Sequence, residues 1–341
     1  MMDSVSTLRP CRHVTNHHST AAVPLAPGAP GEPDALSGIC SVLRTLLYYH
    51  IFDFPLTTDE LHRLSDRRWR NRDEFDSAVA ELVGRGVLRR VGPYCVVGDL
   101  AAVERRRRAE VLARTVLPAA RRRARLIARF PWVLSVSISG TLSKAVHEAD
   151  DDVDFFVITQ PGRLWLCRAS LMAFKKTVLL NSRKLFCVNY LLTSDRLEVP
   201  DRNLFTATEL AWLHPVVDDG LYRALLEANG WLHDLLPNWS ARDEAPEPRP
   251  PRTVGPLVER WLGGPLGDRL DEGSRRLISW RNRRRYRALD PERYDQAMRA
   301  TPEVSKHHPR DFQGAILTRY AALLREAEAR WGLLLQREGQ A

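Results

Sequence analysis

The segment from Val133 to Thr159, VLSVSISGTLSKAVHEADDDVDFFVIT, constrains the fold of this chain more than any other part of it. It starts with an apolar run rich in β-branched residues, Val133–Ile138, which predicts a strand. A corner of small residues, Ser139-Gly140-Thr141, then leads into a helix. A second apolar run, Phe155–Ile158, predicts a second strand. The segment therefore predicts a strand–turn–helix–strand unit within an α/β layer.

Two carboxylates open the second strand. Ten residues separate Thr141 from Asp152-Val153-Asp154. Because side chains alternate along a strand, both acids point to one face and Val153 points to the other. Neighbouring carboxylates repel each other unless a cation lies between them, and a divalent metal is the usual cation. The pattern predicts that Asp152 and Asp154 bind metal, with Mg²⁺ or Mn²⁺ as the ion.

The alternative for these acids is a solvated turn, since Glu148–Asp152 is an acidic run and such runs usually face water. Asp154 argues against this alternative because it lies between apolar residues. The glycine corner adds a second kind of site. Gly140 and Thr141 at a helix start would present backbone N–H groups and the positive end of the helix dipole to phosphate. Metal and phosphate together are the chemistry of nucleotidyl transfer.

These residues resemble a known signature. Gly140-Thr141 followed by Asp152-Val153-Asp154-Phe155 is similar to the Gly-Ser corner and the acid–apolar–acid–apolar motif of the polymerase-β-like nucleotidyltransferase superfamily. Thr141 keeps the hydroxyl of the usual serine. The similarity to bacterial proteins that pair such a domain with a winged helix extends to Leu46–Tyr49 and Phe52–Thr57.

The resemblance implies an activity and a role for each residue. Asp152 and Asp154 would be the catalytic acids that hold Mg²⁺, and Gly140 and Thr141 would contact the phosphates of a nucleoside triphosphate. Lys144 could add a point charge there, although a plain surface lysine is an equally good interpretation. The implied reaction moves a nucleoside monophosphate from the triphosphate to a hydroxyl of an acceptor that the sequence does not identify.

Members of the superfamily usually place a further acid on a later strand. The corresponding predicted strand, Leu185–Leu192, contains no acid, and Asn189 is its polar interior residue. An amide can ligate a metal but cannot act as a base, so Asn189 is a possible substitute for the third acid only as a ligand. A second function therefore stays open, that of a catalytically degenerate nucleotide-binding or DNA-associated regulatory protein.

The rest of the chain predicts further units around this core. Residues 36–100 read as three helices followed by a β-hairpin, an element order that resembles a winged-helix domain. The complete division has six parts: a disordered leader (1–35), the winged helix (36–100), an arginine-rich helical connector (101–130), an α/β nucleotidyltransferase-like domain (131–240), a Pro-rich linker (241–256) and an all-helical C-terminal region (257–341). In the winged helix, the third helix has an acidic start, Asp73-Glu74, which phosphate would repel, so a partner-binding role is as reasonable as DNA reading.

The net charge of +9 is concentrated in the connector. Residues 101–130 contain ten arginines against two glutamates, a local excess of +8. Nucleic acid could bind through Arg105–Arg108 and Arg121–Arg125, or these arginines could form the solvated side of a helix. Pro118 predicts that the segment splits into two helices, Ala101–Leu117 and Ala119–Phe130.

Cysteine usage and hydropathy limit the setting. The five cysteines are scattered without metal-ligand spacing, which is typical of buried thiols in a reducing compartment. No apolar run approaches the length of a membrane span. The sequence therefore predicts a cytoplasmic protein with no membrane partner.

Overall fold

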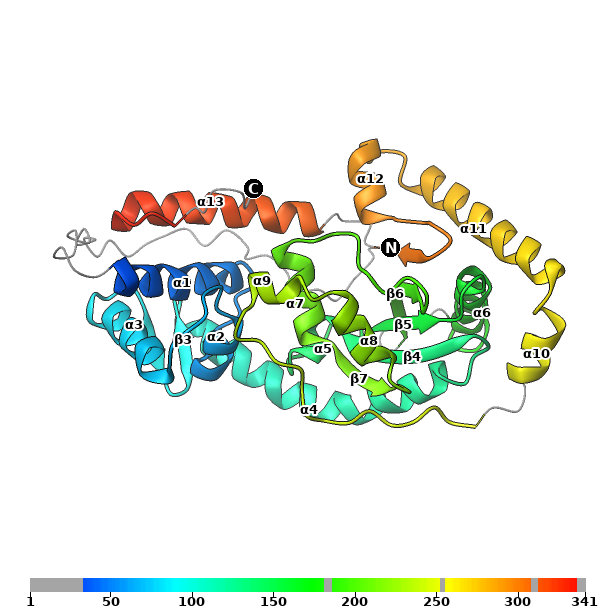
Figure 1. Cartoon of the computed structure of the whole chain (residues 1–341), viewed down its shortest axis with the longest axis horizontal. Coiled ribbons are helices and arrows are strands. Elements are labelled where there is room, and N and C mark those ends of the chain that lie inside the picture. The colour runs from blue at the N-terminus through cyan, green and yellow to red at the C-terminus, as the bar shows by residue number, and fades with distance from the viewer. Residues whose placement is uncertain (1–32, 181–185, 252–254, 308–311, 336–341) are drawn as a thin grey trace.

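Two β-sheets organise the helices in the computed structural model of the chain, which describes residues 33–180, 186–251, 255–307 and 312–335 (Figure 1). A three-stranded antiparallel sheet lies in the N-terminal region and a five-stranded mixed sheet lies in the middle of the chain. The chain is therefore an α/β protein, as predicted. Most of the predicted leader, residues 1–32, falls outside the described residues.

The three helices and the hairpin expected for residues 36–100 are all present. They are α1 (Pro33–His50), α2 (Thr58–Leu64), α3 (Arg72–Gly84), β2 (Arg89–Val91) and β3 (Tyr94–Val96), and a short strand β1 (Leu56–Thr57) pairs with β3. Thr57 begins α2 with a capping box, in which its hydroxyl accepts from the backbone of Glu60 and the Glu60 carboxylate accepts from the backbone of Thr57.

The five-stranded sheet has the order β7-β4-β5-β6-β8. Its strands are β4 (Val133–Ser139), β5 (Asp154–Thr159), β6 (Cys187–Thr193), β7 (His214–Val217) and β8 (Val304–Lys306). β5 and β6 run parallel to each other, and the other neighbours are antiparallel. The three central strands match the predicted ones, except that Phe186 lies outside β6, which starts at Cys187, and the predicted start, Leu185, lies outside the described residues.

Both edge strands were missed by the sequence interpretation. β8 lies in the region expected to be all helical, so that prediction is wrong. β7 contains Pro215, which pairs with Ser137 of β4. An edge strand tolerates proline because one side of its backbone needs no partner. Such short strands form by pairing with an existing sheet, and a local pattern does not reveal them.

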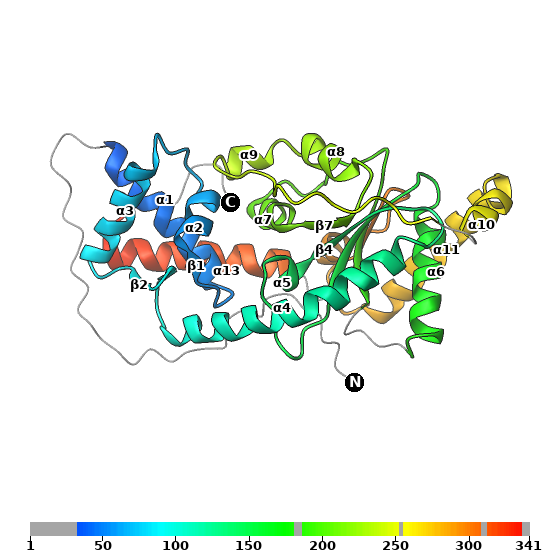
Figure 2. The same ribbon diagram turned by 90° about the horizontal axis from the view of Figure 1, so that it is seen from below.

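Helix α4 (Ala101–Ile127) is continuous through Pro118, which corrects the predicted pair of helices. A proline inside a helix costs about 3 kcal/mol. Packing offsets this cost, because Ala113, Ala120, Ala124 and Ile127 are buried on both sides of the proline in one cluster with the sheet. The helix runs from the N-terminal unit to the sheet (Figure 2).

The two faces of the sheet contact different layers. Phe155 and Val157 share one apolar cluster with α4 and α6 (Leu164–Thr177). Phe156 and Ile158 share the other with α7 (Leu204–Trp212), α8 (Leu221–Ala228) and the N-terminal helices. The last helix, α13 (Phe312–Trp331), also belongs to this second cluster and lies along α1, so the C-terminal region packs on the N-terminal unit (Figure 1).

The Pro-rich segment is extended, as predicted for the linker, and it is attached to the sheet. Glu247 forms a bridge with Val217 at the end of β7, and its carboxylate binds Arg125 of α4 at 2.6 Å. After this segment come α10 (Gly255–Trp261), α11 (Pro265–Arg285) and α12 (Pro291–Ala297), while α9 (Leu232–Leu235) precedes it.

Four cysteines, Cys40, Cys95, Cys167 and Cys187, are buried free thiols in keeping with the prediction, and Cys11 lies outside the described residues. Within the described ranges, none of the helices combines the length and the apolar character needed to cross a bilayer.

Candidate functional site

The glycine corner joins β4 to the single-turn helix α5 (Gly140–Ser143). Gly140 has a φ angle of +68°, in the left-handed region where glycine is free of the Cβ penalty. This explains the glycine at the corner. The helix that was expected after it is only four residues long, so its dipole contributes little to a phosphate site.

The two predicted metal-binding acids lie on one face of the sheet. Asp152 is 4% exposed and Asp154, the first residue of β5, is 2% exposed, while Glu148 and Asp150 in the same acidic run are exposed. Val153 is buried in the cluster on the opposite face. The two acids and Val153 therefore lie on opposite faces of the sheet, as predicted. The carboxylates of Asp152 and Asp154 are buried, so they do not belong to a solvated turn.

Asn189 lies beside Asp154 and donates from Nδ2 to Asp154 Oδ1 at 2.5 Å. A β-bulge in β6 makes this possible, since Phe155 pairs with Val188 but Phe156 pairs with Tyr190, which leaves Asn189 as the extra residue. The Asn189 oxygen accepts from the Cys187 thiol at 3.0 Å. In this arrangement Asn189 orients Asp154 through a hydrogen bond, and its oxygen is directed to a thiol and not to the acids.

Burial raises the pKa of the Asp154 carboxyl well above its usual range, and the charge of Asp152 raises it further. Two buried carboxylates in one place disfavour the ionised form of the pair. A cation between them would remove this repulsion.

Lys144 and Thr141 are both buried at the corner. Lys144 is 4% exposed, and its ammonium donates to Glu209 Oε1 at 2.7 Å and to the Gly140 carbonyl at 3.2 Å. This burial rules out the plain surface lysine. Thr141 donates its hydroxyl to Asp151 at 3.0 Å, which attaches the acidic loop to the corner.

Glu209 of α7 is the residue of this site that the sequence interpretation missed. It is the one charged residue in LFTATELAW, a helix that otherwise reads as core, and an isolated charge in such a helix is a usable signal. The Lys144–Glu209 pair borders a pocket between α1, α7 and α13, lined by Tyr48, Tyr49, Phe52, Lys144, Phe205, Thr208, Glu209 and Ile316.

Asp152 and Asp154 could bind a metal ion that is also bound by the phosphates of the substrate. Among the described residues no group of three or more His, Cys, Asp or Glu side chains could hold a metal ion. Mg²⁺ is commonly bound by one or two carboxylates together with substrate phosphates and water. Asp152 and Asp154 are consistent with that mode and do not make an all-protein metal cage.

Several of the connector arginines form ion pairs inside the protein. Arg106 is buried in ion pairs with Glu60 and Glu110, and Arg121 and Arg125 bind Glu244 and Glu247 of the extended segment. In the set predicted to contact nucleic acid, Arg107, Arg108 and Arg122 are exposed, and Arg107 pairs with Glu104. Part of the basic composition of α4 therefore serves internal ion pairs, a role that neither of the two interpretations given above included.

His214 of β7 lies between Arg121 of α4 and Arg242 of the extended segment. Its ring nitrogens are 3.3 Å from Arg121 Nη2 and 3.2 Å from Arg242 Nη1. Burial, and then the charges of Arg242 and Arg121, lower the pKa of His214 to about 4, against 6.5 for an unperturbed histidine. The neutral ring is the form that the folded protein accommodates.

This histidine predicts a loss of stability in acid. Between about pH 6.5 and pH 4 the unfolded chain takes up a proton that the folded chain excludes, so the free energy of unfolding falls as the pH falls. Urea unfolding of the wild type at pH 7 and pH 5 should differ by about 2 kcal/mol more than that of His214→Asn. His233→Asn, at an exposed position, is the matched control. Equal pH dependence in wild type and His214→Asn would contradict the prediction.

Comparisons of the chain with family models, with curated proteins and with solved structures find no match, so a function has to be argued from the residues of this site.

Proposed function

We propose that this protein is a metal-dependent nucleotidyltransferase, which moves a nucleoside monophosphate from a nucleoside triphosphate to a hydroxyl of an acceptor and releases pyrophosphate. One observation carries the proposal. Asp152 and Asp154 are buried together on one face of the sheet, next to a glycine corner that ends the neighbouring strand. Burying two carboxylates without a function for them would be unfavourable, because each loses its hydration.

The strand arrangement also supports the proposal. Asp154 pairs with Ser139 across β4 and β5, so the acids and the corner lie at the same end of adjacent strands. This is the layout that the resemblance to the polymerase-β-like superfamily implies. We interpret the N-terminal helices and three-stranded sheet in the same way, as a winged-helix unit attached to the nucleotidyltransferase core.

Each residue has a role in this proposal. Asp152 and Asp154 would hold Mg²⁺, which supplies neutralisation of the triphosphate charge when bound. The backbone of Gly140 and Thr141 would contact phosphate oxygens. Lys144 would contribute a positive charge, and Glu209 would hold the Lys144 side chain in position through its 2.7 Å contact.

No side chain of β6 can act as the base that takes up the proton of the substrate hydroxyl. The described side chains of that strand, Cys187–Thr193, include no carboxylate, and Asn189 cannot take up a proton. The proton would pass to water or to a phosphate oxygen of the substrate. A slow reaction is the expected consequence.

Nucleotide binding and transfer test the proposal separately. We expect the purified chain to bind labelled ATP, CTP, GTP or UTP in the presence of Mg²⁺, and the double variant Asp152→Ala/Asp154→Ala to lose about 10²-fold in affinity because the metal has no ligands. Asp150→Ala, at an exposed position in the same loop, should bind as the wild type does. Absence of Mg²⁺-dependent binding in the wild type, or Mg²⁺-dependent binding that the double variant retains, would contradict the proposal.

A transfer assay with the same labelled nucleotides decides between the two candidate functions. Asn189, which occupies the strand where an acid is expected, favours the second function, a degenerate nucleotide-binding or DNA-associated regulatory protein. That function predicts Mg²⁺-dependent binding without transfer of labelled nucleoside monophosphate to any acceptor in a cell extract.

A further inference from the structure

A cluster of two arginines, a tryptophan and a tyrosine lies next to the turn that carries the glycine corner. Arg63 of α2 and Arg242 of the extended segment both stack on Trp212, with guanidinium carbons 5.0 and 5.8 Å from the centre of its ring system. Tyr222 of α8 is close enough for both charges to act on its hydroxyl. Four separate segments thus bring cationic and donor groups to one place.

Two polar atoms of this cluster are buried without a hydrogen-bond partner, Arg63 Nε and the Tyr222 hydroxyl. Tyr222 is only 8% exposed. Arg63 makes one long contact, from Nη2 to the Ala211 carbonyl at 3.4 Å. Leaving a buried donor without an acceptor is unfavourable, so the arrangement calls for an acceptor that the described residues do not supply.

The charges of the cluster are only partly compensated, since Glu60 acts on both arginines and Glu244 acts on Arg242 without direct contact. Neither Arg63 nor Arg242 forms an ion pair with any residue in the described ranges. The nearby acids are engaged elsewhere, since Glu60 binds Arg106 and Glu244 binds Arg121. Burial lowers the pKa of both guanidinium groups, and the charge of Arg63 lowers that of Arg242 further. Two half-buried cations close to each other are stable only with an anion nearby.

We propose that Arg63, Arg242 and Tyr222 bind a phosphate group. Guanidinium groups match the geometry of phosphate oxygens and donate to them in pairs, and stacking on an aromatic ring fixes the plane from which they donate. The Tyr222 hydroxyl supplies a further donor. The site uses neither Asp152 nor Asp154, so it needs no metal and does not depend on the proposed nucleotidyl transfer.

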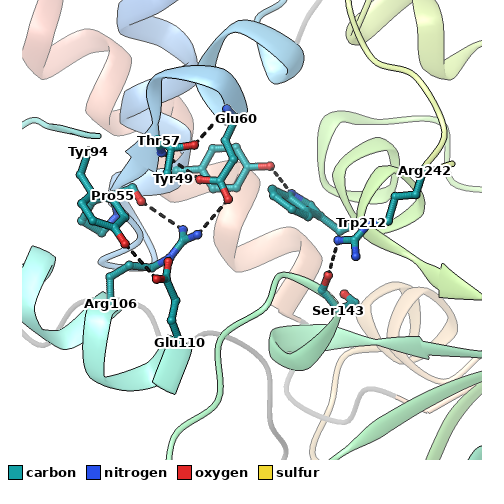
Figure 3. A network of polar contacts seen from close by, with 10 residues as sticks. All are labelled: Tyr49, Pro55, Thr57, Glu60, Tyr94, Arg106, Glu110, Ser143, Trp212 and Arg242. Carbon is teal, nitrogen blue, oxygen red and sulfur yellow. Dashed lines mark hydrogen bonds and ion pairs between the residues drawn. The ribbon is translucent and has the colours of Figure 1, made fainter. Parts of the chain in front are cut away.

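The position of Arg242 connects this site to the glycine corner. Arg242 Nη2 donates to the carbonyl of Ser143, the last residue of α5, at 2.7 Å (Figure 3). A phosphate bound to Arg242 would therefore lie close to the turn that begins at Gly140. Inorganic phosphate, pyrophosphate and the phosphate groups of a nucleotide all carry oxygens that these side chains could bind. A binding experiment distinguishes between these ligands.

Calorimetric titration of the full chain in EDTA, with inorganic phosphate, pyrophosphate and ATP in turn, tests the proposal. We expect the wild type to bind at least one of them, and Arg63→Gln/Arg242→Gln to lose about tenfold or more in affinity. Preference for inorganic phosphate or pyrophosphate would identify a free anion, whereas preference for ATP would identify a nucleotide. Arg68→Gln, at an exposed position on the loop after α2, should bind as the wild type does.

Two further variants keep the test decisive. Tyr222→Phe removes only the hydroxyl, so the protein should melt at the same temperature as the wild type or higher without anion, but should lose most of the melting shift that phosphate produces. Asp152→Ala/Asp154→Ala should retain anion binding, which separates this site from the proposed active site. Lack of anion binding by the wild type, or undiminished binding by Arg63→Gln/Arg242→Gln, would overturn the proposal.

Discussion

Replacing Arg106 by methionine should lower the free energy of unfolding by about 3–5 kcal/mol. This arginine lies at the centre of a buried network between α4 and the N-terminal unit (Figure 3). Its guanidinium donates to Glu110 at 2.7 Å, to Glu60 at 2.8 Å and to the Pro55 carbonyl at 3.1 Å. It also stacks on Phe54, 3.8 Å from the ring centre.

The expected loss is large because the acids depend on this one cation. Methionine fills much of the same volume but leaves Glu60 and Glu110 largely buried without a positive partner. Glu60 also completes the capping box of α2, and Glu110 accepts from the Tyr94 hydroxyl at 2.9 Å, so the damage extends to both elements.

Equilibrium urea unfolding measures the effect. Arg107→Gln is the matched control, because its exposed pair with Glu104 on the same helix is worth less than about 0.5 kcal/mol. The triple variant Arg106→Met/Glu60→Gln/Glu110→Gln should recover much of the loss, since it leaves no buried charge. A loss below about 1 kcal/mol in Arg106→Met would show that the network does not hold α4 to the N-terminal unit.

Replacing Asp154 by asparagine should have the opposite effect on stability. In metal-free buffer the free energy of unfolding should rise by about 1–3 kcal/mol, because the substitution removes a carboxyl group whose ionised form is disfavoured by burial next to Asp152. Asparagine has the same shape, and its side-chain oxygen can still accept from Asn189. The variant should at the same time lose Mg²⁺-dependent nucleotide binding.

This combination separates a functional site from a structural one. Residues that serve function often reduce stability, whereas residues kept for folding do not. Thermal and urea unfolding in EDTA should show the gain for Asp154→Asn and no change for Asp150→Asn, which lies exposed in the same loop. Destabilisation by Asp154→Asn would mean that the carboxylate has a structural role, and would weaken the nucleotidyltransferase proposal.

Hydrophobic patterning was enough to locate the central part of the sheet. The runs Val133–Ile138 and Phe155–Ile158 lie in β4 and β5, and alternation placed Asp152 and Asp154 opposite Val153. These features depend on interactions within a few residues, so the local sequence contains the physical information that determines them.

Features that need contact between distant segments could not be read in this way. Lys144 meets Glu209 across 65 positions of sequence, and Arg106 meets Glu60 across 46. The edge strands β7 and β8 form only because β4 and β6 offer free edges, and α4 passes through Pro118 because tertiary packing offsets the cost.

The sequence by itself determined where the acids and the glycine corner lie, because strand alternation and turn geometry are local properties. Only the tertiary structure decided that the acids are buried, that Lys144 is held by Glu209, and that Arg63 and Arg242 share one aromatic ring. Burial and charge pairing depend on which segments meet, and this is a property of the whole fold.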